Sequence, residues 1–367
     1  MKILEITEFS AGHCGVWTRV LSESKELVKR GHEVVVFSSN IEKGTNKTVS
    51  CDESIGKIRI KRFPHQTDVI DRFVTKNVTG FNFKNEFIKV KPNLVVTHLI
   101  HPHSFKALSL CNKYNIPCYL VTHAPFNVRR GLILTLVKLG YDILNRTNSK
   151  IKKFNKIISV TKWETPYLTK MGVKENKIVY IPNGIPEEFF NQKQTKEKKD
   201  VLFLGRVAPV KNLETLVFAA KLLPKVNFSI VGPAEEGYLK KLNNLIKNMN
   251  NIKLYPVVND LKEKIKLIDE YKIFVLPSKR EAMPQVLLEA MSRRRIVISS
   301  KTDGGKEIIS DGKNGFLFEI NDYKELASLI EKNIKGNKKI QNNAKIEAKK
   351  YKWSVLIKDI ENAYGLG

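Results

Sequence analysis

The order in which short apolar runs and helical segments alternate constrains the fold of this chain more than any other feature. Residues 2–6, K-I-L-E-I, read as a strand, residues 15–30 as a helix, and residues 33–37, E-V-V-V-F, as a second strand. Apolar residues predominate in both short runs, which favours strands. The order strand, helix, strand therefore predicts a βαβ unit and a parallel sheet.

The same alternation recurs in two series, and a polar segment at residues 191–199 reads as the linker between them. A chain of 367 residues is also too long for one ordinary core. We therefore expect an α/β protein with two domains, at residues 1–190 and 200–352, and a ligand cleft between them. A final helix within residues 353–367 is expected to pack back on the first domain. Further strands are expected at residues 58–60, 94–97, 118–121, 156–160 and 178–181, and then at 201–205, 227–231, 253–255, 273–276, 296–299 and 316–318.

Cysteine use and hydropathy indicate the compartment. The four cysteines form neither a C-x-x-C pair nor a disulfide framework. The N-terminus reads as a strand rather than a signal peptide, and no apolar run approaches the length of a membrane span. These features predict a cytoplasmic protein.

The net charge of +27 predicts attraction to polyanions. No zinc-finger spacing, R-G-G repeat or basic–aromatic pattern accompanies it, so we do not expect nucleic acid as the main partner. Residues 131–146 are amphipathic, which fits either a core-facing helix or a helix on a membrane surface. The second reading would place the protein peripherally on the inner face of an anionic membrane. The basic residues that favour it are Arg129, Arg130, Lys150, Lys152 and Lys153.

Residues 277–294, P-S-K-R-E-A-M-P-Q-V-L-L-E-A-M-S-R-R, combine a strand end, a loop and a helix that begins near Pro284. Glu281 lies in the loop and Glu289 on the helix, eight positions apart. Open α/β sheets bind ligands beyond the carboxyl ends of their strands, where both carboxylates are expected. The alternative is that both are solvated surface charges, as glutamates commonly are.

Polar residues also follow expected strands of the first domain. His98 follows one strand, with His101 and His103 just beyond it, and His123 follows the next. Zinc on the first three histidines is conceivable, but no acidic or Cys partner is placed to complete the site, and we expect no metal. A neutral His123 that hydrogen-bonds a ligand hydroxyl is the favoured reading. The first turn, residues 10–16, contains glycines where a backbone can approach a ligand, but it lacks G-x-G-x-x-G.

Several of these stretches resemble the nucleotide-sugar glycosyltransferases of family 4, which have the two-domain GT-B fold. The resemblance implies two Rossmann-like domains that face each other across a cleft, and it covers nearly the whole chain. It rests on G-R-V-A-P-V-K-N at residues 205–212, I-V-G-P at 230–233, the stretch at 277–291, D-G-G-K-E-I-I at 303–309 and D-G-K-N-G-F-L at 311–317, with weaker landmarks R-G-H-E-V, V-T-H-A-P-F, I-S-V-T-K-W-E and I-P-N-G-I.

The resemblance also implies roles for single residues. Arg206 and Lys211 would bind the donor diphosphate, and Glu289 the ribose hydroxyls. Glu281 and His123 are the expected catalytic residues beside the donor sugar. Gly15 matches one glycine of the family's first loop, whereas Cys14 stands where a second glycine is usual. The donor-sugar loop would consist of Ala282, Met283, Pro284 and Gln285.

The expected activity is transfer of a hexose from a UDP- or GDP-sugar to a cell-surface glycan or lipid-linked acceptor, with retention of configuration. Fixed cations can stabilise the departing diphosphate, and no D-x-D motif is present, so neither a metal nor another cofactor is expected. A catalytically inactive, membrane-docked scaffold of the same fold is the alternative from another functional class. A nucleic-acid binder is the third.

Overall fold

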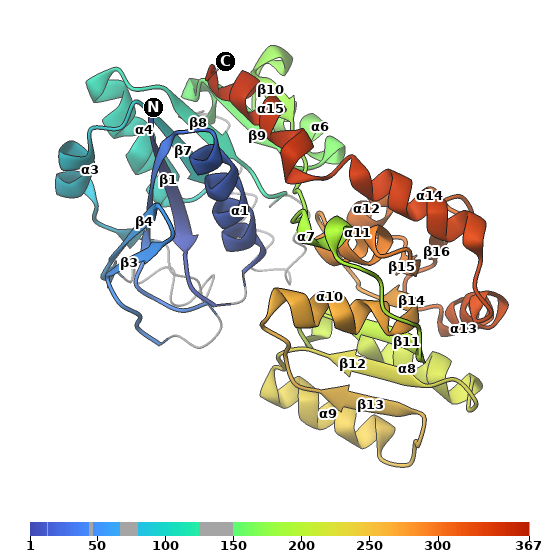
Figure 1. Cartoon of the computed structure of the whole chain (residues 1–367). Helices are drawn as coiled ribbons and strands as arrows, with labels where there is room; N and C mark the ends of the chain where they lie inside the picture. Colours follow the sequence, from blue (N-terminus) through green and yellow to red (C-terminus); the bar gives the residue numbers. More distant parts are fainter. Residues whose placement is uncertain (13, 44–46, 67–79, 125–149, 367) are drawn as a thin grey trace. The chain divides into compact units, whose positions relative to one another are not determined.

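In the computed structural model, the described residues are 1–12, 14–43, 47–66, 80–124 and 150–366. The chain divides into two compact units, Met1–Gly184 with Trp353–Gly367, and Ile185–Lys352 (Figure 1). Each unit is built on a mainly or wholly parallel sheet, which confirms the α/β class. Residues 185–190, assigned above to the first domain, belong to the second unit, where the carbonyl of Phe189 accepts a hydrogen bond from Arg293.

The sheet of the first unit has eight strands in the order β10-β9-β8-β7-β1-β2-β4-β3. All neighbours are parallel except β3 and β4. A separate pair, β5 and β6, is antiparallel. The strands are β1 (Lys2–Phe9), β2 (Glu33–Ser39), β3 (Asp52–Ile55), β4 (Ile58–Phe63), β5 (His65–Gln66), β6 (Gly80–Phe81), β7 (Leu94–His98), β8 (Cys118–Val121), β9 (Lys156–Ser159) and β10 (Ile178–Tyr180).

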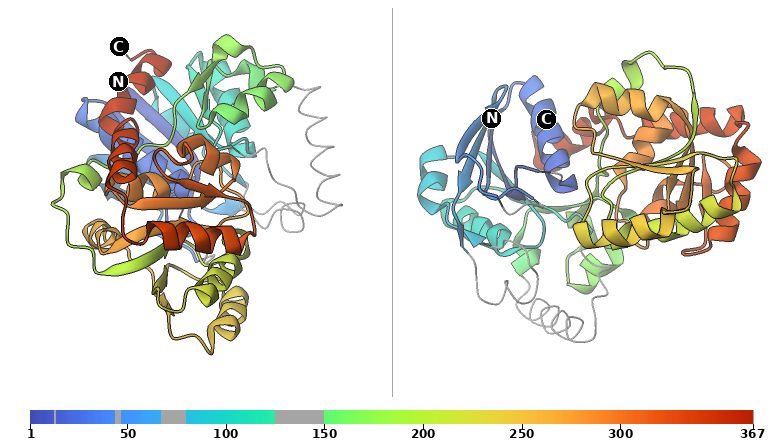
Figure 2. Two further views of the ribbon diagram at one scale, coloured as in Figure 1. Left: turned by 90° about the vertical axis from the view of Figure 1, so that its right-hand side faces the viewer. Right: turned by 90° about the horizontal axis from the view of Figure 1, so that it is seen from below.

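Helices cover both faces of this sheet (Figure 2). From β1 the chain crosses to β2 in one direction, and from β7 it crosses to β8 in the other, so right-handed crossovers place α1 and α4 on opposite faces. The C-terminal helix α15 lies beside α1, where Tyr364 Oη donates to Glu23 Oε1 at 2.6 Å. The helices are α1 (Gly15–Lys29), α3 (Lys84–Val90), α4 (Pro102–Tyr114), η1 (Lys150–Lys153), η2 (Lys162–Glu164), α6 (Thr165–Lys170), η3 (Glu175–Lys177) and α15 (Trp353–Tyr364).

The sheet of the second unit has six parallel strands in the order β13-β12-β11-β14-β15-β16. Its strands are β11 (Lys199–Leu204), β12 (Phe228–Val231), β13 (Ile252–Tyr255), β14 (Tyr271–Leu276), β15 (Ile296–Ser300) and β16 (Phe316–Phe318). Its helices are α7 (Glu188–Asn191), η4 (Pro209–Lys211), α8 (Leu213–Leu222), α9 (Glu236–Ile246), α10 (Leu261–Asp269), α11 (Gln285–Ser292), α12 (Asp303–Ile308), α13 (Tyr323–Asn333) and α14 (Lys338–Lys349). The buried apolar runs of the sequence analysis are thus confirmed as strands.

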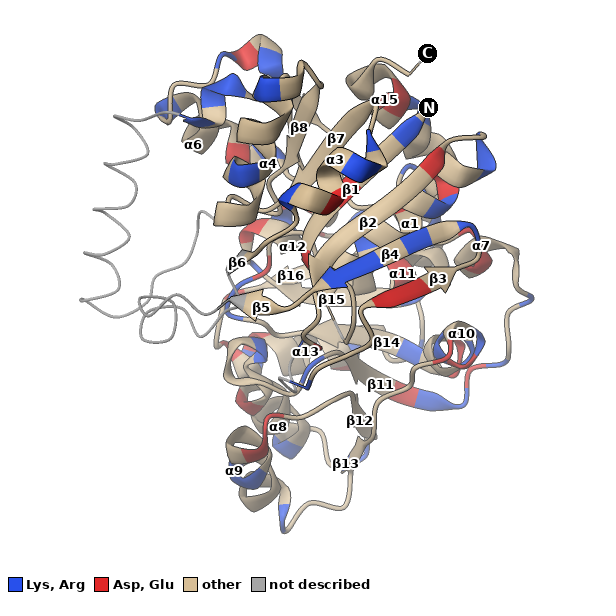
Figure 3. Ribbon diagram, turned by 90° about the vertical axis from the view of Figure 1, so that its left-hand side faces the viewer, with Lys and Arg blue, Asp and Glu red and all other residues tan. Residues whose placement is uncertain are grey.

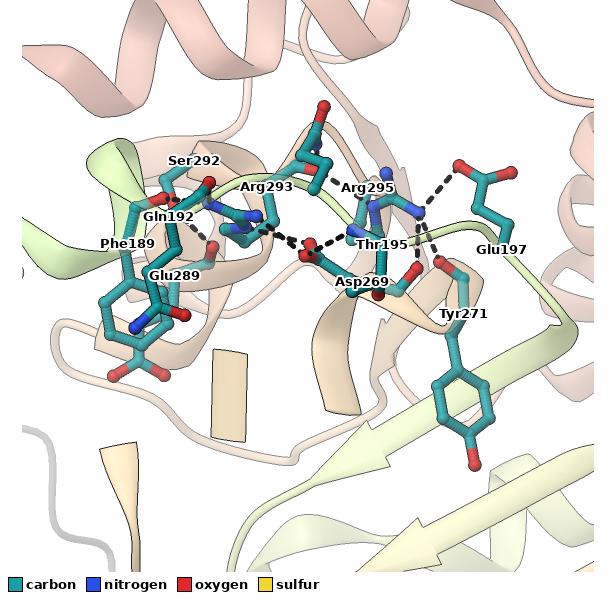
Figure 4. Close-up of polar contacts among 11 residues, drawn as sticks. Phe189, Gln192, Thr195, Glu197, Asp269, Tyr271, Glu289, Ser292, Arg293 and Arg295 are labelled. Carbon is teal, nitrogen blue, oxygen red and sulfur yellow. Dashed lines mark hydrogen bonds and ion pairs between the residues drawn. The ribbon is translucent and has the colours of Figure 1, made fainter. Parts of the chain in front are cut away.

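The polar linker is held on the second unit by a buried ion pair (Figure 4). Arg293 donates from Nε and Nη2 to both carboxylate oxygens of Asp269, at 2.8 and 2.7 Å. Its remaining nitrogen, Nη1, donates to the carbonyls of Phe189 and Gln192, while Asp269 also accepts the backbone N–H of Thr195. A bidentate Arg–carboxylate pair fixes both partners in one geometry, so the linker runs in a defined path over this unit.

Charged residues are spread over both units rather than gathered in one arm (Figure 3). On the edge of the first sheet, basic β4 lies beside acidic β3, where Arg62 pairs with Glu53 and Lys61 lies 3.9 Å from Asp52. Charges on an edge strand discourage pairing with another chain. The amphipathic stretch 131–146, with Arg129 and Arg130, lies outside the described residues.

Candidate active site

The sheet of the second unit reverses direction between β11 and β14, which lie side by side at its centre. From β11 the chain winds outward through β12 to β13, and from β14 it winds the other way to β16. Open α/β sheets bind ligands outside the carboxyl ends of the strands at such a switch point. Arg206 and Lys211 follow β11, and Glu281 follows β14, so the sequence-predicted donor residues are placed at this point.

Backbone contacts tie the loop after β14 to its neighbours. This loop, residues 277–284, is called the donor loop below. The N–H of Lys279 donates to the carbonyl of Val210 at 2.9 Å, and the N–H of Gly304 donates to the carbonyl of Glu281 at 3.0 Å. A Cβ on Gly304 would lie 2.5 Å from the carbonyl oxygen of Ala282. Only glycine therefore allows the loop to pass this closely, which explains the first glycine of the D-G-G motif.

Asn212 is a second connector, and the sequence analysis did not single it out. It adopts a left-handed conformation with φ of 53°, which asparagine tolerates better than most residues. Its side-chain amide donates to the carbonyl of Pro277 at 3.1 Å and to Thr215 Oγ1 at 2.8 Å. Because the side chain is buried, these bonds hold the loops after β11 and β14 together.

Lys211 and Glu281 lie in direct contact. Lys211 Nζ donates to Glu281 Oε1 at 2.6 Å, and Ser278 Oγ donates to the same oxygen at 2.6 Å. The two charged side chains are 19% and 11% exposed, so the pair is shielded but still reachable from solvent. The structure therefore brings together a cation and a carboxylate that the sequence analysis predicted for one site. Ser278, which orients the carboxylate, was missed.

Glu289 lies on the second turn of α11, and its side chain is buried. Lys264 of α10 holds it, with Nζ at 2.7 Å from Oε1 and 2.6 Å from Oε2. The pairing offsets part of the free-energy cost of burying a charged group. Lys264 was also missed, and no local motif could have identified it because it approaches from another helix.

Arg206 differs from the other predicted donor residues because its side chain is 59% exposed. It pairs with Glu235, which is 48% exposed, at 2.8 Å. Exposed pairs of this kind contribute little to stability, and a ligand can displace one partner easily. In the donor loop, Met283 and Pro284 are buried and Ala282 is partly exposed, as is Gln285, which begins α11.

The first unit has its own switch point, between β1 and β7. In the turn after β1, Gly12 has φ of 80°, and a Cβ there would lie 2.5 Å from the carbonyl oxygen of Lys43. Gly15, the predicted first-loop residue, instead starts α1 and has no atom within 4 Å of an added Cβ. Gly12 therefore shapes the turn, and Gly15 leaves open space beside the helix N-terminus.

His123 follows β8, and both it and Ala124 adopt left-handed φ values, 57° and 53°. Residues without this conformational freedom are held there only when their surroundings enforce it, and such strain clusters at functional sites. Glu164 supplies the constraint: its Oε1 accepts the N–H of Ala124 at 2.6 Å and the hydroxyl of Thr122 at 2.6 Å. Its Oε2 accepts the N–H groups of Val160 and Thr161 at 2.9 and 3.1 Å.

Burial raises the pKa of Glu164, and hydrogen bonds from Thr122 and from backbone N–H groups work against that rise. Glu164 is the last residue of I-S-V-T-K-W-E, one of the stretches that resemble the family. The sequence therefore marked this position, but it did not predict what the side chain does.

The His123 side chain is partly exposed and contacts a second histidine. Its Nε2 lies 2.9 Å from Nδ1 of His98, and Nε2 of His98 lies 2.7 Å from Oε2 of Glu5. His103 does not join them as a ligand, because its Nε2 contacts the carbonyl of His98 at 2.9 Å. Over the described ranges, no group of three or more His, Cys, Asp and Glu side chains is arranged to hold a metal ion.

Two family sequence models match adjacent parts of the chain. The model described as "Glycosyltransferase Family 4" matches residues 14–189, and the one described as "Glycosyl transferases group 1" matches residues 184–351. Together they span nearly the whole chain. The protein is therefore a glycosyltransferase of the GT-B class, and it belongs to glycosyltransferase family 4.

Relatives and solved structures agree with this assignment. An uncharacterized glycosyltransferase of Haemophilus influenzae is 28% identical, over 89% of this chain and 88% of that one. The N,N'-diacetylbacillosaminyl-diphospho-undecaprenol alpha-1,3-N-acetylgalactosaminyltransferase of Campylobacter jejuni is 24% identical, over 63% of this chain and 65% of that one. HepE of Anabaena, solved with UDP-glucose, is similar in fold with a TM-score of 0.74, 17% identity, and coverage of 100% of both chains.

Membrane attachment is not visible as a spanning segment. Among the helices of the described residues, none combines the length and the apolar character that crossing a membrane requires.

Proposed function

We propose that the protein is a retaining glycosyltransferase that transfers a hexose from a UDP- or GDP-sugar to a glycan or lipid-linked acceptor. The observation that carries this proposal is the Lys211–Glu281 pair in the donor loop at the switch point of the second unit. A diphosphate brings its own negative charge, so it can replace Glu281 as the partner of Lys211. Glu281 is then released to accept hydrogen bonds from the donor sugar.

An apolar cavity supports a nucleoside as the other end of the donor. It has a volume of about 510 Å³ and lies at the carboxyl ends of β12 and β13. Val207, one residue after Arg206, lines it together with Gly232, Leu254 and Tyr255. The flat faces of a nucleobase ring can pack against a concave apolar site, and the cation of Arg206, one residue from the cavity lining, would then bind the first phosphates.

The proposed chemistry is that implied by the family resemblance, with the cations of the second unit in the role of charge stabilisers. The bond between the sugar C1 and the diphosphate oxygen breaks, and the oxygen keeps the electron pair. Lys211 and Arg206 stabilise the charge that develops on the diphosphate without a metal ion. The acceptor hydroxyl attacks C1 from the face that the diphosphate leaves, and a phosphate oxygen takes its proton. Configuration at C1 is therefore retained, and no protein nucleophile is needed, in contrast to the carboxylate pair of retaining glycosidases.

The acceptor class rests on the relatives. The Campylobacter relative is named for transfer to a diphospho-undecaprenol sugar, which is a lipid-linked acceptor. The Anabaena structure holds UDP-glucose. We extend both chemistries to this chain as its donor and acceptor classes.

The test is transfer from a panel of UDP- and GDP-hexoses to undecaprenyl-diphosphate-linked sugars, followed by mass spectrometry. Removing one charge-stabilising donor lowers kcat by about 10²–10³-fold in other enzymes, and we expect a loss of this size for Lys211→Ala. Glu281→Gln should also lose transfer. The matched control is Lys240→Ala, which removes an exposed lysine paired with Glu236 on α9 and should leave the rate unchanged. Full activity of the Lys211 variant would contradict the proposal.

Two further measurements test the finer points. NMR of the first product formed should show the anomeric configuration of the donor, and an inverted product would overturn the retaining mechanism. Transfer should continue after EDTA treatment, and a rate restored only by added Mg²⁺ or Mn²⁺ would contradict metal independence.

We also propose that the protein docks on anionic membranes. Among the described residues, the support for this docking comes from Lys150, Lys152 and Lys153 on η1, and the net charge of +27 adds to it. Basic segments are attracted to anionic lipid by about 1 kcal/mol per charge. In liposome flotation, the protein should float with phosphatidylglycerol vesicles and not with neutral vesicles, and equal behaviour on both would exclude this docking.

A further inference from the structure

A chain of three buried or half-buried side chains connects the core of the first unit to His123. Glu5 of β1 and His98 of β7 are fully buried, and His123 is partly exposed. Glu5 Oε2 lies 2.7 Å from His98 Nε2, and His98 Nδ1 lies 2.9 Å from His123 Nε2. Both nitrogens of His98 are therefore engaged. Within the described part of the chain, no hydrogen bond is formed by Nδ1 of His123, so this nitrogen is available for a ligand.

Both imidazoles are neutral. Burial lowers the pKa of His98 to about 3. The pKa of His123 is also lowered, mainly by burial and to a lesser extent by the nearby His98 and Arg19. A neutral imidazole carries one N–H, so it donates from one nitrogen and accepts at the other. Every hydrogen bond in the chain must therefore point in the same direction.

Only two directions are possible. If Glu5 is protonated, it donates to Nε2 of His98, His98 donates from Nδ1 to Nε2 of His123, and His123 carries its proton on Nδ1. If Glu5 is ionised, it accepts from Nε2 of His98, His98 accepts from Nε2 of His123, and Nδ1 of His123 is a bare acceptor. The two states differ by one proton, which Glu5 gains or loses.

The surroundings of Glu5 favour the protonated state at neutral pH. Burial raises its pKa to about 8, and the Arg19 guanidinium of α1 limits the rise. Arg19 is engaged through Nε, which donates to Glu23, and through Nη1, which donates to the carbonyls of residues 181 and 182, whereas its Nη2 is buried without a partner among the described residues. Glu23 of α1 and Tyr364 of α15 also interact electrostatically with Glu5. The second oxygen of Glu5, Oε1, is buried with no hydrogen-bond partner, which a neutral carboxyl tolerates far better than a carboxylate.

We propose that Glu5 and His98 are positioning residues that set whether His123 presents a hydrogen-bond donor or an acceptor to the ligand. At neutral pH, His123 presents Nδ1–H, which can donate to a hydroxyl or phosphate oxygen of a bound ligand. When Glu5 ionises, the outward nitrogen presents a lone pair, which repels an anionic oxygen. This inference rests on the proposed function only for the identity of the ligand; the hydrogen-bond chain exists without it.

The test measures the tautomer of His123 directly in the unliganded full-length protein by ¹⁵N NMR of histidine side chains. The His123→Asn variant identifies the signal. The Nδ1–H tautomer should dominate at pH 6.5 and give way to the Nε2–H tautomer as the pH rises past about 8. In Glu5→Gln, the amide can still hydrogen-bond Nε2 of His98 but cannot ionise, so the tautomer of His123 should not change as the pH rises past about 8. Glu23→Gln, the matched control in the same cluster, should keep the transition.

A tautomer of His123 that ignores pH in the wild-type protein, or one that changes equally in Glu5→Gln, would overturn the proposal. The wild-type titration decides this even if a variant fails to fold. The kinetic counterpart is an alkaline decline of kcat/KM near the same pH that Glu5→Gln removes. A tautomer switch without any nucleotide-sugar turnover would contradict the proposed function but support the role of Glu5 and His98. Turnover without the tautomer switch would support the proposed function but contradict the role of Glu5 and His98.

Discussion

The two units present their predicted site residues in opposite ways. In the second unit, Lys211 and Glu281 are ionic, reachable from solvent and paired with each other. In the first unit, His123 is fixed in a left-handed turn, and the groups behind it, Glu5, His98 and Glu164, are buried.

This difference separates two ways of building a site. An ion pair near the surface can exchange partners, so an anionic ligand replaces one member at low cost. A buried polar network cannot exchange its partners for water, so it holds its side chains in one fixed geometry. Substitutions in the first unit should therefore mainly lower the free energy of unfolding and disturb the geometry of the site. Substitutions in the second unit should mainly lower the affinity for the ligand.

The largest effect is expected for Glu164→Ala. This change leaves the N–H groups of Ala124, Val160 and Thr161 without their acceptor in a buried site. Each unsatisfied buried group costs about 1–3 kcal/mol, so the free energy of unfolding should fall by at least about 3 kcal/mol in urea titrations. Glu175→Ala, on the exposed surface of η3, should change it by less than about 0.5 kcal/mol. If the two variants had equal free energies of unfolding, the buried network of the first unit would not have the stabilising role given to it here.

The buried histidines should make the first unit sensitive to acid. Burial lowers the pKa of His103 to about 4, below its ordinary value of 6.5. Its contribution to stability is therefore present above pH 6.5 and is lost as the pH falls towards 4, by about 1.4 kcal/mol per pH unit. The difference in free energy of unfolding between the wild type and His103→Gln should shrink by this slope on acidification. A difference that does not depend on pH would show that His103 titrates normally.

In the second unit, Glu289→Gln should weaken donor binding by about tenfold, or ~1.4 kcal/mol, because a neutral amide accepts hydrogen bonds from two ribose hydroxyls less well. The wild type should discriminate against a 2′-deoxynucleotide donor, and the variant should lose that preference. KM values for both donors provide the measurement. Glu263→Gln, on the exposed face of α10, is the control. If the variant still discriminated against the 2′-deoxynucleotide donor as the wild type does, Glu289 would not bind the ribose.

The smallest effect is expected for Glu235→Gln, which removes the exposed partner of Arg206. The free energy of unfolding should change by less than about 0.5 kcal/mol. Binding of the diphosphate should be unchanged or slightly tighter, since Arg206 no longer has a competing carboxylate. Calorimetry would measure both effects, and weaker binding would mean that Glu235 supports Arg206 rather than competing with the ligand.

Sequence reasoning predicted the parallel strands because most of them are short runs in which apolar residues predominate, and β7, β14 and β15 fell close to their expected positions. It missed β3, whose sequence D-E-S-I carries edge charges and little apolar character. It placed Glu281 and Glu289 correctly in a loop and on a helix, since the strand before them and Pro284 mark the boundaries.

What the sequence could not supply is long-range pairing. Lys264 reaches Glu289 from another helix, and Glu164 reaches the His123 turn from 40 positions away along the chain. Arg293 and Arg295 follow α11 in sequence, where a basic residue suits the helix dipole. In the structure both are buried, and Arg293 anchors the linker through Asp269. Such contacts depend on tertiary packing and leave no local pattern.

The most direct test of the account separates the phosphates from the nucleoside. Calorimetry should measure the affinities of UDP, GDP and the corresponding nucleosides for the wild type and for Lys211→Met. One nucleoside diphosphate should bind the wild type, and the variant should bind it at least about tenfold more weakly while its affinity for the matching nucleoside stays the same. Equal affinities of both proteins for the diphosphate, or an equal loss for nucleoside and diphosphate, would contradict a diphosphate site at Lys211.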